Sequence, residues 1–125
     1  MLLQLCKAKL HRLTVTNADL NYVGSITLDQ NLLRAGHIRP FEMVQITSLA
    51  TGVRWVTYVI PAPAGSGTVC LNGSAARHFH PGDLIIVLSS GLCTEAEAAD
   101  LVSRVVFVDE KNRITLVESF PPASP

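Results

Sequence analysis

Short runs of apolar and β-branched residues, separated by Gly, Pro, Asn and Asp, recur along nearly the whole of this 125-residue chain. The clearest are residues 43–48 and 53–60, joined by residues 49–52, which have the composition of a hairpin connection. Further extended segments are expected at residues 3–16, 20–28, 68–71, 84–89, 105–108 and 114–117. Many short strands with turns between them predict a mainly β fold in the form of a small closed barrel.

Three short helical segments are expected beside the strands. Asp29 has the residue type of an N-cap for residues 30–35, and Thr94 with Glu97 has the spacing of a capping box for residues 95–101. Residues 75–79 are expected to form a helical turn with Ser74 as its N-cap. Residues 17–19 have the composition of a turn or a cap.

The size and charge of the chain limit what it can do. At 125 residues it has room for one hydrophobic core, so a single domain is expected. Ten basic and ten acidic residues give a formal net charge of zero, whereas nucleic-acid binding needs a basic excess on one face and is therefore not expected. Nearly half of the residues are apolar, which hints at contacts between subunits.

The cysteines and the first residues indicate a compartment. Cys6, Cys70 and Cys93 are odd in number and widely spaced, which is typical of reduced, mostly buried thiols in a cytosolic protein. The first seven residues lack the basic region of a signal peptide, and no apolar run approaches the ~20 residues of a membrane-spanning helix. A cytoplasmic protein without membrane contact is expected.

The common catalytic and metal-binding motifs are missing from the sequence. There is no Gly-rich nucleotide loop, no His-Glu-x-x-His motif and no Gly-x-Ser-x-Gly nucleophile motif. His78 and His80 flank Phe79 and could share a strand face as metal ligands, but a third ligand is not evident. A surface or packing role is the favoured interpretation of both histidines, and no metal is expected.

Three Gly-Ser pairs remain as candidates for chemistry, at residues 24–25, 65–66 and 73–74. Such pairs are ordinary turn material, so their surroundings must separate them. The second lies in a flexible Pro/Gly loop, and the third is explained by a helix N-cap. Gly24-Ser25 lies between two segments expected to be extended, and a rigid frame of this kind can hold strain in a peptide bond. The pair ranks first, but no sequence rule assigns it a reaction.

A series of short motifs runs in order through residues 5–115. It begins with Lys-Leu-His-Arg at 9–12, Thr-Val-Thr at 14–16 and Ala-Asp-Leu-Asn-Tyr-Val-Gly-Ser-Ile at 18–26. It continues with Arg54, Thr-Tyr at 57–58, Asn-Gly at 72–73, Pro-Gly-Asp at 81–83 and residues 105–114. Together these motifs resemble the bacterial aspartate 1-decarboxylases, a family of small pyruvoyl-dependent enzymes.

The resemblance implies conversion of L-aspartate to β-alanine and CO2, which supplies pantothenate and coenzyme A biosynthesis. Removing an α-carboxylate leaves a carbanion, and no native side chain is an electron sink for it. In the family, autocatalytic cleavage, here between Gly24 and Ser25, turns the serine into a pyruvoyl group that binds the substrate as a Schiff base. A serine is required because its oxygen is first nucleophile and then leaving group.

The resemblance also implies roles for other residues. Arg54 is expected to bind a substrate carboxylate through its planar guanidinium group. Tyr58 is expected to return a proton to the substrate Cα, and Thr57 to stabilise the oxyanion of self-cleavage and line the substrate site. Because Thr57 and Tyr58 are adjacent in a strand, they should face opposite sides. The other expected binding residues are Lys9, His11, Asn72, Gly73, Ser74 and Ala75, and Ser74 stands where the family usually has alanine.

The fold implied by the resemblance is a six-stranded double-psi β-barrel with short helices, assembled as a homotetramer with active sites at subunit interfaces. One domain is expected over residues 1–118, followed by a disordered tail at 119–125. A need for a maturation helper protein stays open. So do two alternatives: a non-enzymatic small barrel that binds a partner, and a self-processing enzyme for a different small acidic amino acid.

Overall fold

The computed structural model describes residues 1–122, and it is mainly β with short helices, as expected. The strands of this part of the chain are β1 (Leu3–Thr14), β2 (Asn17–Asp19), β3 (Ser25–Asp29), β4 (Met43–Ser48), β5 (Arg54–Ala62), β6 (Val69–Asn72), β7 (Leu84–Cys93), β8 (Ser103–Val108) and β9 (Ile114–Phe120). The helices are α1 (Gln30–Gly36), the 3-10 helix η1 (Gly73–Arg77) and α2 (Glu95–Ala98).

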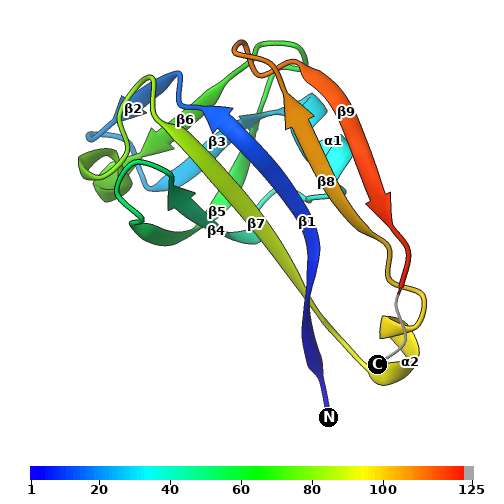
Figure 1. Cartoon of the computed structure of the whole chain (residues 1–125). Helices are drawn as coiled ribbons and strands as arrows, with labels where there is room; N and C mark the ends of the chain where they lie inside the picture. The colour runs from blue at the N-terminus through cyan, green and yellow to red at the C-terminus, as the bar shows by residue number, and fades with distance from the viewer. Residues whose placement is uncertain (123–125) are drawn as a thin grey trace.

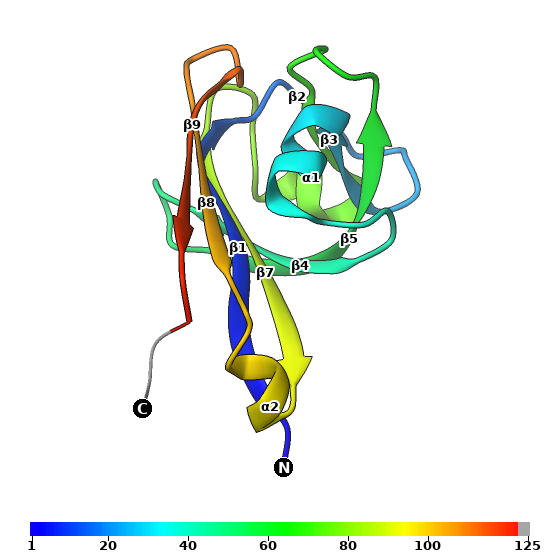
Figure 2. The same cartoon turned by 90° about the vertical axis from the view of Figure 1, so that its right-hand side faces the viewer.

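All of these strands join one continuous sheet in the order β2-β6-β3-β5-β4-β7-β1-β8-β9. The sheet curls around α1, which packs against β1, β3 and β8 (Figure 2). The core lies between them and includes Leu10, Ile26 and Val59 from the sheet and Leu32 and Leu33 from α1. None of the helices within residues 1–122 is long and apolar enough to cross a membrane.

The strand order is open, so the closed six-stranded double-psi barrel is not confirmed. Its two end strands, β2 and β9, do not pair within residues 1–122, and the chain bends at Val15 and Thr16 between β1 and the end strand β2. The backbone N–H groups of Val15 and Thr16 donate to the carbonyls of Asp83 at 2.9 Å and Val69 at 2.8 Å. These two hydrogen bonds tie the bend between β1 and β2 to the residue before β7 and to β6.

A long antiparallel ladder between β1 and β7 extends beyond the body of the molecule and ends near the N-terminus and α2 (Figure 1). The capping box expected at Thr94 and Glu97 is confirmed, although α2 ends at Ala98 rather than at residue 101. Asp29 caps α1 as expected and accepts from the Asn31 N–H at 2.8 Å. The helix ends with His37 in the left-handed region.

Three local expectations were wrong. Residues 17–19 form strand β2, because they pair with residues 70–72 of β6. Residues 20–24 are turns and bends rather than an extended segment. Asn72, not Ser74, occupies the N-cap position of η1, because the helix begins two residues earlier than expected, at Gly73.

The C-terminal boundary also differs from the expectation. β9 continues to Phe120, two residues beyond the expected domain limit, because Ser119 and Phe120 pair with Arg104 and Ser103 of β8. Residues 123–125 of the expected tail lie outside the described residues.

Candidate functional site

The first of the three Gly-Ser pairs lies where β3 begins, between β5 and β6. Ser25 pairs with Asn72 of β6 in antiparallel register, and Ile26 pairs with Val59 of β5 in parallel register. Ser25 therefore lies level with Tyr58, one residue before the Ile26–Val59 pair. The register of three short strands thus brings together residues that are far apart in the sequence.

Alternation along these strands creates a polar row beside the apolar core. Ile26 and Leu71 are fully buried in the core, and their neighbours point to the opposite face of the sheet. That face carries Ser25, Asn72 and Thr27. Ser25 and Asn72 are nevertheless only 1% and 4% exposed, so their polar atoms need partners within the protein.

The side-chain amide of Asn72 supplies those partners. Its Nδ2 donates to Ser25 Oγ at 3.0 Å and to Thr27 Oγ1 at 2.9 Å. Its Oδ1 accepts from Cys70 Sγ at 3.2 Å. Both N–H groups and the oxygen of the amide are used, which explains why this N-cap side chain makes no hydrogen bond to η1.

The backbone at Gly24-Ser25 is confined on one side. Ser25 has a φ of 153°, a region that a residue with a side chain rarely adopts and that costs on the order of 1–3 kcal/mol. Gly73 has a φ of 68°, and a Cβ there would lie 2.9 Å from Gly24 Cα and 3.2 Å from the Tyr22 carbonyl oxygen. The rigid frame therefore comes from β3 and Gly73, and not from residues 21–23 as expected.

Thr57 and Tyr58 face opposite sides of β5, as expected. Thr57 is buried, whereas Tyr58 is half-buried and its ring stacks on that of Phe41, with ring centroids 5.9 Å apart. Within residues 1–122, Thr57 makes no side-chain hydrogen bond to Ser25. The structure thus places Tyr58 level with Ser25 and directs Thr57 away from it.

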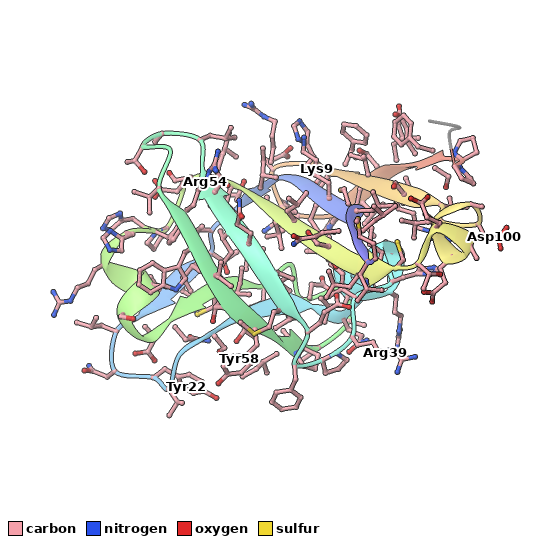
Figure 3. The ribbon with its side chains drawn as sticks, turned by 90° about the horizontal axis from the view of Figure 1, so that it is seen from below. Lys9, Tyr22, Arg39, Arg54, Tyr58 and Asp100 are labelled. Atoms are coloured by element: carbon pink, nitrogen blue, oxygen red, sulfur yellow. The ribbon has the colours of Figure 1, made fainter. Side chains whose placement is uncertain are left out.

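Arg54 and Lys9 lie apart from this cluster. Arg54 precedes Tyr58 by four residues of β5, which is about 13 Å along the strand. The ladders through β7 and β4 place Lys9 level with Val56 but three strands away, which is about 14 Å. In Figure 3, Arg54 and Lys9 lie toward one side of the view and Tyr58 toward the other. One copy of the chain does not gather all the expected site residues.

His11 is also remote from Ser25. It pairs with Phe107 of β8, and the two rings meet edge to face with centroids 5.4 Å apart. Its Nδ1 is buried and has no hydrogen-bond partner in the described chain. Burial, followed by the positive charges of Lys9 and Arg12, lowers the pKa of His11 below its usual value of 6.5. The region around Lys9 is therefore electropositive.

The remaining expected residues divide between the site and the surface. Ala75 is buried in η1, while Ser74 is exposed. His78 packs against the ring of Trp55, and His80 Nδ1 lies 3.7 Å from an Asp83 oxygen. Across residues 1–122 there is no cluster of three His, Cys, Asp or Glu side chains that could hold a metal ion.

The sequence interpretation missed Cys70 and Thr27 as members of the polar row. A signal was present, because each stands two residues from a chosen residue: Cys70 from Asn72, and Thr27 from Ser25. In a strand that spacing places both side chains on the same face. The sequence does not show that β3 and β6, which carry these residues, are neighbouring strands. All three cysteines are free, as expected, although Cys6 is exposed.

Comparison with known proteins shows the family to which the chain belongs. A family model described as aspartate decarboxylase matches residues 1–115. The chain belongs to the aspartate decarboxylase family. This membership confirms the resemblance drawn from the motifs and the prediction of an enzyme of the carbon–carbon lyase class.

Individual members of the aspartate decarboxylase family match most of the chain. The aspartate 1-decarboxylase of Moorella thermoacetica is 52% identical over 112 residues, which cover 90% of this chain and 88% of the relative. That of Acetivibrio thermocellus is 51% identical over 119 residues, covering 95% and 94%. That of Stenotrophomonas maltophilia is 52% identical over 115 residues, covering 92% and 91%.

Proposed function

We propose that this chain decarboxylates L-aspartate to β-alanine and CO2, using a pyruvoyl group formed from its own Ser25. The observation that carries the proposal is the buried Ser25 hydroxyl, next to a confined Gly24–Ser25 peptide bond and hydrogen-bonded to Asn72. The names of relatives about half identical to this chain support the substrate. Supply of pantothenate and coenzyme A biosynthesis follows from the product.

Maturation begins when Ser25 Oγ attacks the carbonyl carbon of Gly24. The carbon–nitrogen bond breaks, the nitrogen of residue 25 takes up a proton, and an ester joins the two residues. Loss of the Ser25 Cα proton then expels the Gly24 carboxylate together with the serine oxygen. Hydrolysis then releases the nitrogen of residue 25 as ammonia, and the oxygen of water takes its place. The products are chains 1–24 and 25–125.

The surroundings of Ser25 fit the group that this sequence of steps would leave. A pyruvoyl group has neither the hydroxyl nor the N–H of serine, so it occupies less room at the start of β3. Gly73, where a Cβ would collide with Gly24, keeps space beside the cleavage point. Once formed, the pyruvoyl group supplies the electron sink that decarboxylation requires.

The other site residues bind the substrate and move a proton. The guanidinium of Arg54 binds the distal carboxylate of aspartate in two parallel hydrogen bonds, and Lys9 adds positive charge. The Tyr58 hydroxyl returns a proton to the substrate Cα after CO2 has left. Thr57 faces away from Ser25 across β5, so its role toward the oxyanion that forms at Gly24 is assigned on the family motifs alone.

A second copy of the chain completes the site in this proposal. Only two carbon–carbon bonds of about 1.5 Å separate the Cα of aspartate from its distal carboxylate carbon, whereas Arg54 and Tyr58 are far apart on β5. The face of β5 between them carries Val56, which is 62% exposed, and Phe41 and Met43 beside Tyr58 are also exposed. Such apolar patches are typical of subunit contacts, which supports a homotetramer of barrel-like subunits with sites at their interfaces.

Mass spectrometry of the purified chain tests self-cleavage. We expect two chains that meet between residues 24 and 25, the second lacking its α-amino group. Protein that remains a single 125-residue chain after prolonged warming, both alone and with cell extract, would refute the proposal. Comparison of the two incubations also shows whether a maturation helper is needed. The free cysteines support the cytoplasm as the setting of the reaction.

Turnover of aspartate and glutamate distinguishes the substrate from other small acidic amino acids. Glutamate carries one more methylene, which shifts its distal carboxylate relative to Arg54 and costs roughly 10- to 200-fold in kcat/KM. We expect β-alanine to form from aspartate at the higher rate. Equal turnover of both acids would contradict the assignment of aspartate as substrate.

A further inference from the structure

The thiol of Cys70 faces the reactive serine through one intervening side chain. Cys70 is 8% exposed, and its Sγ lies 3.2 Å from Asn72 Oδ1. The opposite side of the same amide holds the oxygens of Ser25 and Thr27. Cys70 thus contacts the Asn72 amide, whose orientation determines whether an N–H group or an oxygen faces Ser25 Oγ.

We propose that Cys70 is a positioning residue for self-cleavage, because its S–H holds the Asn72 amide with the N–H group toward Ser25 Oγ. This inference rests on the proposed function of Ser25. An amide rotated by 180° would present its oxygen to Ser25 and its nitrogen to sulfur, which is a weak hydrogen-bond acceptor. A thiol donor therefore favours the observed orientation over the rotated one.

The thiol must carry its proton to act in this way. Burial, followed by the negative charge of Asp19, raises the pKa of Cys70 above its usual value of 9.0. The group therefore stays in the S–H form at neutral pH. A thiolate would instead repel the Asn72 oxygen, which already carries a partial negative charge.

The orientation of the amide matters for the chemistry at Ser25. While Oγ accepts a hydrogen bond from Asn72, its own proton is free to leave toward a base. The same N–H stabilises the negative charge that Oγ carries once its proton has left, and again when Oγ departs as part of the Gly24 carboxylate. A rotated amide would bind the hydroxyl proton and bring its oxygen against that charge.

Two substitutions at Cys70 separate positioning from packing. Cys70→Ala removes the donor, and we expect the rate of chain cleavage to fall by about five- to tenfold, the equivalent of one weak hydrogen bond. Cys70→Ser restores a donor of similar size, and we expect cleavage within about twofold of the wild-type rate. Thermal unfolding of each variant establishes that it is folded.

Cys93 provides a matched control within the chain. It is a second buried free cysteine with the same 8% exposure, and within residues 1–122 its Sγ makes one hydrogen bond, to the Leu3 carbonyl at 3.8 Å. We expect Cys93→Ala to create a comparable cavity without changing the cleavage rate. Cleavage of Cys70→Ala at the wild-type rate would overturn the inference, and so would a Cys70→Ser variant as slow as Cys70→Ala.

A direct measurement keeps this test independent of the proposed function. Hydrogen exchange of the Asn72 side-chain N–H groups can be followed by NMR in any chain that is still uncleaved. We expect exchange to be about fivefold faster in Cys70→Ala than in wild type and Cys70→Ser, because the amide loses one of its three hydrogen bonds. A wild-type chain that never cleaves defeats the proposed function, whereas equal exchange in all three proteins defeats the role of Cys70.

Discussion

The two ends of the outer face of β5 are built in opposite ways. At the Tyr58 end, Ser25 and Asn72 are buried, and Asn72 uses every hydrogen-bonding group of its amide. At the other end, Arg54 is exposed, and neither it nor Lys9 forms a salt bridge within residues 1–122. The first region is complete within one chain, whereas the second carries positive charge that an anion or another subunit can approach. This difference suggests that maturation needs the first region and that substrate binding also needs the second.

The largest effect is expected from removing the reactive hydroxyl. Ser25→Ala leaves no nucleophile for the Gly24 carbonyl, so we expect one intact chain by mass spectrometry and no β-alanine production. The matched control is Ser66→Ala, in the second Gly-Ser pair, which should cleave and turn over like wild type. Residual decarboxylation by Ser25→Ala would mean that the reaction does not depend on this serine.

The second prediction concerns the cationic region. Arg54→Ala should cleave itself at the wild-type rate but lose about 10- to 100-fold in kcat/KM for aspartate, because charged hydrogen bonds to a carboxylate are lost. Arg39→Ala, which removes another exposed arginine, should change neither quantity. Chain cleavage followed by mass spectrometry and β-alanine formation measure the two steps separately. A strong loss of cleavage in Arg54→Ala would contradict the inference that maturation needs only the region around Ser25.

The third prediction tests the close approach of Gly73 to Gly24. Gly73→Ala places a Cβ 2.9 Å from Gly24 Cα at a φ of 68°, so we expect slower cleavage and a loss of about 1–3 kcal/mol in the free energy of unfolding. Gly82→Ala is the control, because its φ of 91° is equally unfavourable but no atom lies within 4 Å of the added Cβ. Denaturant unfolding and cleavage rates should be affected together only in Gly73→Ala.

The smallest expected effect is a change in the pKa of His11, which reports the positive charge near Lys9. Lys9→Met should raise this pKa toward 6.5, because one of the charges that lower it is removed. Lys7→Met should leave it unchanged, since Lys7 pairs with Glu42 at 2.6 Å and does not contribute to the shift. NMR titration of the imidazole ring protons measures both values. Equal values in wild type and Lys9→Met would show that Lys9 does not act on this region.

The lowered pKa of His11 also predicts the direction of a pH effect on stability. The unfolded chain binds a proton at His11 below about pH 6.5, while the folded protein still holds the ring neutral. Stability should therefore fall as the pH decreases from 6.5 through the lowered value, and His11→Gln should flatten that part of the profile. Urea unfolding at several pH values measures the effect.

Local patterns predicted many of the strands and helix caps correctly. Asp29 and the Thr94–Glu97 pair form caps through residues at most three positions away, so their chemistry is visible in the sequence. Residues 17–19 were misjudged because their strand pairing depends on a distant strand, β6. The roles of the site residues came from the family motifs, and they remain predictions.

The sequence by itself determined the mainly β class and the family, and it ranked Gly24-Ser25 first among three similar pairs. Tertiary structure decided which residues surround that pair. Asn72 reaches Ser25 from 47 positions away, and Cys70 reaches it only through Asn72. Arg54, which the motifs place in the same site, lies at the other end of β5. Period-two alternation tells which side chains share a strand face, but only strand pairing across the sheet determines which faces meet.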